Sequence, residues 1–290
     1  RAMIERKIKF NDHEDSIFLW GARQTGKSTL LMQRFPEAKY YDLLESDLYE
    51  RFRRQPSLLR NELSMIDSKT LIIIDEIQKI PELLDEVHWL MSRRNMRFIL
   101  SGSSSRKLRK CGANLLGGRA IRQQLFPFVS AEIPDFNLSR AINNGMLPRH
   151  YLIENPAKRL QAYVGDYLRE EIKEEALTRN IASFSRFLET AAINDGEILN
   201  YNNIATDCGV SAPTVKEYFS ILEETLIGYT LPAYTKTVKR RMIQAPKFYI
   251  FDIGVVNYLT HRKNLQPGSI DYGHALEHLI VQEIMAYLSY

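Results

Sequence analysis

The chain has 290 residues, of which 44% are hydrophobic, so it can bury the core of one large domain or of two to three small domains. Lysine and arginine outnumber aspartate and glutamate by 39 to 35, a mild basic excess that allows a polyanionic partner but does not require one. The two distant cysteines, Cys111 and Cys208, exclude a disulfide framework and a cysteine-based metal site, and they favour a reducing compartment.

A glycine-rich loop lies between a predicted strand and a predicted helix near the start of the chain. The apolar run Ile17 to Trp20 predicts a buried strand, and Leu30 to Met32 predicts the first turns of a helix. Between them, Gly21 to Thr29 read G-A-R-Q-T-G-K-S-T, a complete G-x-x-x-x-G-K-[ST] phosphate-binding loop. The alternative interpretation is an ordinary glycine-rich turn.

The residues of this loop have roles that follow from the chemistry of a nucleotide phosphate. Backbone N–H groups at a helix N-terminus attract anions, and Gly21 and Gly26 let the backbone approach the phosphates closely. Lys27 is expected to reach the β- and γ-phosphates and Ser28 to ligate Mg²⁺. The nucleotide-binding residues predicted by the motif are Gly21, Ala22, Arg23, Gln24, Thr25, Gly26, Lys27, Ser28 and Thr29.

A second apolar strand, Thr70 to Ile74, ends in the carboxylates Asp75 and Glu76. A run that is apolar on both faces is typical of a central parallel strand covered by helices. In combination with the phosphate-binding loop, Asp75 is predicted to hold the Mg²⁺ shell, and Glu76 is predicted to act as the general base that activates water. A structural role for both carboxylates is the alternative.

Four segments in this order resemble a bacterial and archaeal family of AAA+-type ATPases, which carry a C-terminal winged-helix region and often a restriction-endonuclease-like tail. The segments are Gly21 to Thr29, Ile74 to Lys79, Leu100 to Ser103 and Leu115 to Arg119. The resemblance continues through residues 144–148, 163–174 and 247–254, so it covers nearly the whole chain. It implies an α/β core with a five-stranded parallel sheet, and ATP rather than GTP as the nucleotide.

The resemblance also implies further candidate site residues. The tip of the strand Arg97 to Ser103 would carry a polar residue near the γ-phosphate, for which Ser103 is the first candidate and Ser101 the second; a helix N-cap is the alternative role. Arg119 would act as an arginine finger on a neighbouring subunit of a homo-oligomer, and a surface or inter-domain salt bridge is its alternative role. Ile4 and Ile8 could lie beside the adenine or on a surface helix.

The second half reads as a charged helical linker followed by a helix-turn-helix. Gly209 is the predicted turn, and Ser211 is predicted to cap a second helix that buries Val215 and Leu222. Two strands, 226–231 and 247–251, flank a basic wing whose candidate DNA contacts are Lys236, Lys239, Arg240 and Arg241. The acids on the second helix oppose tight DNA binding, so a lid or a subunit contact remains the alternative.

The expected divisions are a P-loop ATPase core at 1–133, a helical linker at 134–180, a winged helix at 181–260 and a C-terminal helix at 261–290. By the resemblance, Glu277 matches the first acidic residue of a nuclease-like tail, but the other metal ligands of such a tail are missing; His274 and His278 are expected to form a surface pair.

The chain starts without methionine and ends inside a helical pattern, which indicates a fragment. Because it has no leader and no apolar run near the roughly 18 residues of a membrane span, we expect a cytoplasmic protein without a membrane partner.

These expectations combine into a Mg²⁺-dependent ATPase that hydrolyses ATP to ADP and phosphate, and so drives a conformational change in a DNA- or protein-associated assembly. The alternative is a nucleotide-dependent switch or DNA-binding regulator that binds ATP and hydrolyses it negligibly.

Overall fold

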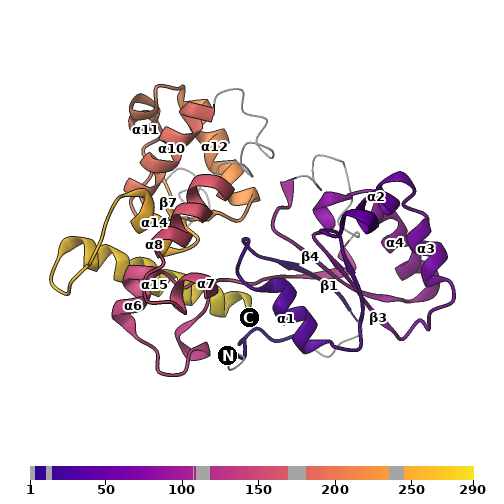
Figure 1. Ribbon diagram of the computed structural model, residues 1–290. Coiled ribbons are helices and arrows are strands. Elements are labelled where there is room, and N and C mark those ends of the chain that lie inside the picture. The colour runs from indigo at the N-terminus through magenta and orange to yellow at the C-terminus, as the bar shows by residue number, and fades with distance from the viewer. Residues whose placement is uncertain (1–3, 11–14, 107, 109–117, 169–180, 235–244) are drawn as a thin grey trace. The chain divides into compact units, whose positions relative to one another are not determined.

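The computed structural model describes residues 4–10, 15–106, 108, 118–168, 181–234 and 245–290 (Figure 1). The chain divides into two compact units, of which one comprises residues 6–125 with 289–290 and the other residues 126–288 with 1–5. Each unit is described by itself.

The first unit is built on a five-stranded parallel sheet, as the sequence predicts. The strands are β1 (Ser16–Trp20), β2 (Lys39–Asp42), β3 (Leu71–Asp75), β4 (Arg97–Gly102) and β5 (Ala120–Gln124), in the order β2-β3-β4-β1-β5. The three inner strands are almost wholly buried, which is why their sequences are continuous apolar runs. Because all five strands are parallel, the residues that follow β1, β3 and β4 meet at one edge of the sheet.

Helices connect these strands (Figure 1). They are α1 (Lys27–Arg34), α2 (Ser46–Arg54), α3 (Leu58–Leu63), the short 3-10 helix η1 (Ile77–Lys79) and α4 (Leu83–Arg94). The predicted break at Pro56 is confirmed, since it lies between α2 and α3. The expected surface helix at the N-terminus is wrong: residues 4–10 form neither helix nor strand, because Ile8 and Phe10 are buried against the apolar side chains of β1 and α1.

The second unit is mainly helical. Its elements are η3 (Ser130–Glu132), α6 (Leu138–Asn144), α7 (Pro148–Tyr151), α8 (Ala157–Gln161), the π-helix η4 (Ala162–Leu168), α10 (Ile181–Ile193), α11 (Tyr201–Cys208), α12 (Ala212–Glu224), β6 (Gly228–Leu231), β7 (Lys247–Ile250), α14 (Ile253–Leu259) and α15 (Ile270–Ser289). In the predicted linker, Leu160, Tyr163 and Val164 are buried, as their helical spacing indicates.

Helices α11 and α12 and the turn between them have the local chemistry that the sequence predicts. Gly209 ends α11 in the left-handed conformation, with φ of 66°, and the Ser211 hydroxyl accepts the Thr214 N–H at 3.3 Å to cap α12. Strands β6 and β7 then pair antiparallel, and Ile198 forms an isolated bridge with Lys247. The candidate wing residues, Lys236, Lys239, Arg240 and Arg241, lie outside the described residues.

A buried carboxylate holds α14 to the segment that follows α6. Asp252 accepts the backbone N–H groups of Met146 at 2.7 Å, Leu147 at 3.0 Å and Gly254 at 3.0 Å. Burial raises the pKa of Asp252, whereas the nearby His150 and these backbone N–H groups oppose the increase. A Cβ atom at Gly145 would lie 2.2 Å from the Asp252 carboxylate, so the close approach requires glycine there.

Candidate nucleotide site

The glycine-rich loop is folded tightly between the end of β1 and the start of α1. Gly26 has φ of 96°, in the left-handed region, and its carbonyl accepts the first helical hydrogen bond from Leu30 N at 2.9 Å. Gly21 donates its N–H to Gly102 O at 3.2 Å, and a Cβ atom at Gly21 would stand 2.6 Å from Leu125 O. The loop is thereby fixed to the ends of both neighbouring strands, β4 and β5.

Lys27 points back into this loop rather than into solvent. Its ammonium group donates to Gly21 O at 2.8 Å and to Ala22 O at 3.2 Å, and the side chain is buried. The guanidinium of Arg6, from the segment that precedes β1, donates to Thr25 O at 2.7 Å. Two cationic side chains thus approach the loop that the sequence assigns to phosphates.

The carboxylate of Asp75 is fully buried and receives four donors. Oδ2 accepts from the Ser28 hydroxyl at 2.5 Å and from the Tyr40 hydroxyl at 2.6 Å. Oδ1 accepts from Glu76 N at 3.1 Å and from the Ser101 hydroxyl. The parallel sheet explains this convergence, because Ser28, Tyr40, Asp75 and Ser101 come from four different elements that meet at one edge.

Tyr40 acts as a donor to Asp75 because its phenol stays protonated. Burial, followed by the charge of Asp75, raises the pKa of Tyr40 above its usual range. The adjacent Tyr41 is buried on the other face of β2 and donates to Glu62 at 3.3 Å, as expected from the alternation of side chains along a strand.

Glu76 lies in a second polar group next to the Asp75 cluster. Its backbone has φ of 59°, which is unusual for a residue other than glycine, and its side chain is buried. Oε2 of Glu76 accepts from Gln78 Nε2 and from the Ser103 hydroxyl at 3.4 Å. Ser103 also accepts from Gln78 Nε2 at 3.2 Å and from Arg23 Nε at 3.5 Å, which connects the glycine-rich loop to Glu76.

The structure brings both serine candidates to this edge, but beside different carboxylates. Ser101 contacts Asp75, whereas Ser103 contacts Glu76. The neighbouring Ser104 hydroxyl accepts the Arg106 N–H at 3.3 Å, a bond of the N-cap kind that was the alternative role for Ser103.

Arg119 lies at the amino-terminal ends of the parallel strands, opposite the ends that carry the glycine-rich loop. It precedes β5, and Ala120 at the start of β5 pairs with Ser16 at the start of β1, whereas the glycine-rich loop follows the end of β1. A strand of this length spans about 13 Å, so Arg119 is well separated from the loop of its own chain. Its guanidinium donates to the Ser92 hydroxyl of α4 and lies 3.2 Å from Nε2 of His88, and the residue is exposed.

Sequence reasoning missed three residues of this site: Arg6, Tyr40 and Gln78. Gln78 lies within the I-D-E-I-Q-K segment, so its proximity to Glu76 is a signal that could have found it. Tyr40 faces Asp75 only through the pairing of β2 with β3, in which Tyr40 stands beside Ile73, and the sequence does not specify that register.

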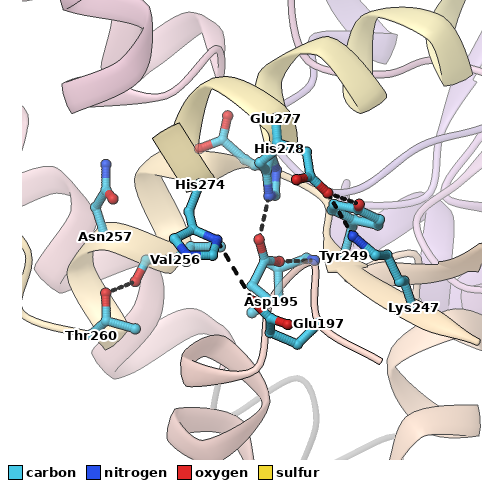
Figure 2. Close-up of polar contacts among 12 residues, drawn as sticks. Asp195, Glu197, Lys247, Tyr249, Val256, Asn257, Thr260, His274, Glu277 and His278 are labelled. Carbon is cyan, nitrogen blue, oxygen red and sulfur yellow. Dashed lines mark hydrogen bonds and ion pairs between the residues drawn. The ribbon is translucent and has the colours of Figure 1, made fainter. Parts of the chain in front are cut away.

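A separate polar cluster in the second unit surrounds the start of α15 (Figure 2). His278 is fully buried, with Nδ1 2.6 Å from Asp195 Oδ2, and Glu277 accepts from Lys247 Nζ and the Tyr249 hydroxyl, each at 2.8 Å. The expected surface pair of histidines is therefore wrong, because His278 is buried and only His274 is partly exposed. Among the described residues no group of three or more His, Cys, Asp or Glu side chains could hold a metal ion.

None of the helices within the described ranges has the length and apolar character needed to cross a membrane.

Comparison with known proteins agrees with this division of the chain. Residues 13–133 match a family model described as an AAA domain, and residues 135–266 match one described as a domain of unknown function (DUF8612). An uncharacterized protein of Mycobacterium tuberculosis is 26% identical over 91% of this chain and 62% of its own length. Another, from Haemophilus influenzae, is 22% identical over 98% of this chain and 79% of its own length. The chain thus spans about three fifths of the mycobacterial relative.

Among solved structures, the Walker-type ATPase PABY2304 of Pyrococcus abyssi superimposes with a TM-score of 0.53 at 14% identity, covering 86% of this chain and 91% of that one. At this identity the likeness concerns the fold alone. The parallel sheet, the AAA match over residues 13–133 and this likeness agree on the fold of a P-loop ATPase for the N-terminal half.

Proposed function

We propose that the chain is a Mg²⁺-dependent ATPase that hydrolyses ATP to ADP and phosphate. The observation that carries the proposal is the hydrogen bond between Ser28 and Asp75, which joins the end of the phosphate-binding motif to the end of β3. Two unrelated parts of the sequence, each predicted to serve the same cation, meet there. The base preference for adenine comes from the AAA match rather than from the loop.

The residues at this position suit a hard divalent cation. Mg²⁺ prefers oxygen ligands and keeps several waters, and the Ser28 hydroxyl with the Asp75 carboxylate supplies one protein ligand and one acceptor for bound water. When bound, Mg²⁺ neutralises charge on the phosphates. Ser28 and Asp75 would hold the cation, and the backbone N–H groups of the loop would bind the phosphate oxygens.

The remaining side chains would position and activate the nucleophile. The ammonium group of Lys27 would donate to phosphate oxygens in place of the Gly21 and Ala22 carbonyl oxygens, because the phosphate oxygens carry more negative charge. Glu76 would accept the proton of the attacking water, since its carboxylate lies beside the Asp75 cluster and is held by Gln78 and Ser103.

A Glu76→Gln variant tests this assignment, because it keeps the shape of the side chain and removes its basicity. We expect ATP affinity within about twofold of the parent and a loss of phosphate release of about 10² to 10⁴, the usual contribution of a general base. Phosphate release and equilibrium binding of a fluorescent ATP analogue measure the two properties separately. Unchanged hydrolysis in this variant would remove Glu76 from the mechanism. The alternative function, a switch with negligible turnover, predicts equally low turnover in parent and variant.

The second part of the proposal is that the chain forms a homo-oligomer in which Arg119 acts on the nucleotide of a neighbouring subunit. Its place at the start of β5, away from its own loop, supports action on a neighbouring subunit. A guanidinium on the γ-phosphate stabilises transition-state charge and accelerates hydrolysis by about 10³ to 10⁵ in related chemistry. Light scattering with and without ATP and Mg²⁺ tests the assembly, and a monomer under both conditions would contradict it.

DNA contact through a winged helix is the third part. The capped α12 and the β6–β7 pair support it, and the basic residues 236–241 would supply phosphate contacts. Charge reversal of Lys239, Arg240 and Arg241 should weaken DNA binding and flatten its salt dependence. An unaffected affinity would favour a lid or subunit contact. Phosphate release with and without DNA also separates an ATP-driven machine from a DNA-binding regulator.

A further inference from the structure

The Asp75 carboxylate is saturated with hydrogen-bond donors. A carboxylate has about four lone-pair positions on its two oxygens, and Asp75 fills them with Ser28 and Tyr40 on Oδ2 and with Ser101 and Glu76 N on Oδ1. A hydrated divalent cation beside Ser28 needs an acceptor for one of its waters on this carboxylate. One of the four donors must therefore give up its position when the cation is taken up.

Three of the four donors are poorly placed to leave. The N–H of Glu76 is part of the backbone that follows β3. Ser101 is fully buried on β4, which lies between β3 and β1. Ser28 is itself the expected ligand of the cation. If its hydroxyl moved away from Asp75, the site would lose that ligand and the cation would gain no place to bind.

Tyr40 is the donor that can move. It lies on β2, the edge strand of the sheet, and its side chain is partly exposed, unlike that of Asp75 or Ser101. Although the Tyr40 ring packs against the apolar core of this unit, the residue is only partly buried, so its hydroxyl can turn away from Asp75 without moving β3 or β4. Because Tyr40 shares Oδ2 with Ser28, its hydroxyl stands on the side of the carboxylate that faces the proposed cation site.

We propose that Tyr40 is a positioning residue that controls uptake of the divalent cation: its hydroxyl holds the acceptor position on Asp75 that the hydrated cation needs, and it yields that position when the cation binds. The inference rests on the proposed ATPase function and adds a residue that the phosphate-binding motif does not contain. Its consequence is a built-in competition that raises the Mg²⁺ concentration needed to load the site.

The test compares Tyr40→Phe with Tyr41→Phe in the full chain. The first removes only the hydroxyl that reaches Asp75, and the second removes only the neighbouring hydroxyl that reaches Glu62 on the other face of β2. Binding of a fluorescent ATP analogue is followed by anisotropy while Mg²⁺ is titrated, and the Mg²⁺ concentration at the midpoint is recorded. Thermal unfolding verifies that each variant is folded, and Tyr40→Leu provides a second variant without the hydroxyl.

We expect the midpoint for Tyr40→Phe to fall about tenfold, the change that corresponds to losing one hydrogen bond to a charged group. Tyr40→Leu should shift in the same direction, and Tyr41→Phe should match the parent. An unchanged or higher midpoint for the folded Tyr40 variants overturns the role of Tyr40 while leaving the proposed function intact, and so does an equal shift in Tyr41→Phe. A parent protein that binds no nucleotide overturns the proposed function, and this inference with it.

Discussion

The hydroxyl of Ser28 lies 2.5 Å from Oδ2 of Asp75, although one strand and two helices of the chain lie between the two residues. The parallel sheet makes this possible, because α1 begins where β1 ends and Asp75 closes β3 at the same edge. A hydroxyl and a carboxylate at this distance form a strong, charge-assisted hydrogen bond. The same two groups are the predicted holders of the cation.

Removing the ammonium of Lys27 should abolish nucleotide binding. In Lys27→Ala, the Gly21 and Ala22 carbonyls lose their donor and the phosphates lose a buried cation, so we expect at least a hundredfold weaker ATP binding by anisotropy. Lys39→Ala is the matched control, because that lysine is exposed and lies over the Tyr41 ring rather than in the loop. Equal affinity in Lys27→Ala and the parent would contradict the assignment of the loop.

Subunit complementation should reveal the action of Arg119. Lys27→Ala and Arg119→Ala are each expected to lose phosphate release, by about 10² or more for the arginine. If Arg119 serves a neighbouring site, a mixture of the two variants contains some intact sites, and partial activity returns. A mixture that stays as inactive as its components indicates that Arg119 serves its own structure through His88 and Ser92.

Replacing Asp252 should destabilise the second unit strongly. In Asp252→Ala three backbone N–H groups, those of Met146, Leu147 and Gly254, lose their buried acceptor, and we expect the free energy of unfolding to fall by about 3 kcal/mol. Asp271→Ala is the control, since its ion pair with Arg262 is half-exposed and such pairs contribute at most about 1 kcal/mol. Urea unfolding measures both values, and similar losses would show that Asp252 is not the joint between α6 and α14.

The Glu277 contacts predict a pH dependence in the acid range. Hydrogen bonds from Lys247 and then Tyr249 lower the pKa of Glu277. Because the pKa of Glu277 is lower in the folded state, its ionised carboxylate stabilises the fold at pH values above the unfolded-state pKa of about 4.3. This stabilisation is lost as the pH falls through the folded-state pKa. Glu277→Gln should therefore lower the melting temperature at neutral pH by a few degrees at most, and the difference from the parent should disappear once the pH has fallen below the folded-state pKa. Glu217→Gln, at an exposed position on α12, is the control for the loss of one negative charge.

Much of the candidate nucleotide site, as a cluster of side chains at one edge of the sheet, could be predicted from the sequence because its main residues belong to short contiguous motifs. Lys27 and Ser28 are fixed by the loop, and Asp75 by its place at the end of an apolar strand. Tyr40 could not be predicted in the same way, since a strand of four residues shows only that alternate side chains share a face. Which face meets Asp75 depends on the pairing of β2 with β3.

The misplaced histidine has a different cause. His274 and His278 are four residues apart, which suggests one common face, but the buried face of α15 contains Ala275, His278, Leu279, Gln282 and Ala286. This spacing was present in the sequence, and it places His278 inside the apolar stripe and His274 at its border. The period of the helix is therefore a better guide to burial here than the polarity of the single residue. Only the partner of His278, Asp195, required the tertiary structure.

Gly102 stands where β4 ends, and a Cβ atom there would lie 2.5 Å from Oε1 of Gln78 and 2.9 Å from the Trp20 ring. Trp20 leads into the glycine-rich loop and Gln78 holds Glu76, so a single methyl group would push on both at once. A side chain at this position would therefore disturb the glycine-rich loop and the partner of Glu76 together, although Gly102 touches no substrate in the proposed scheme.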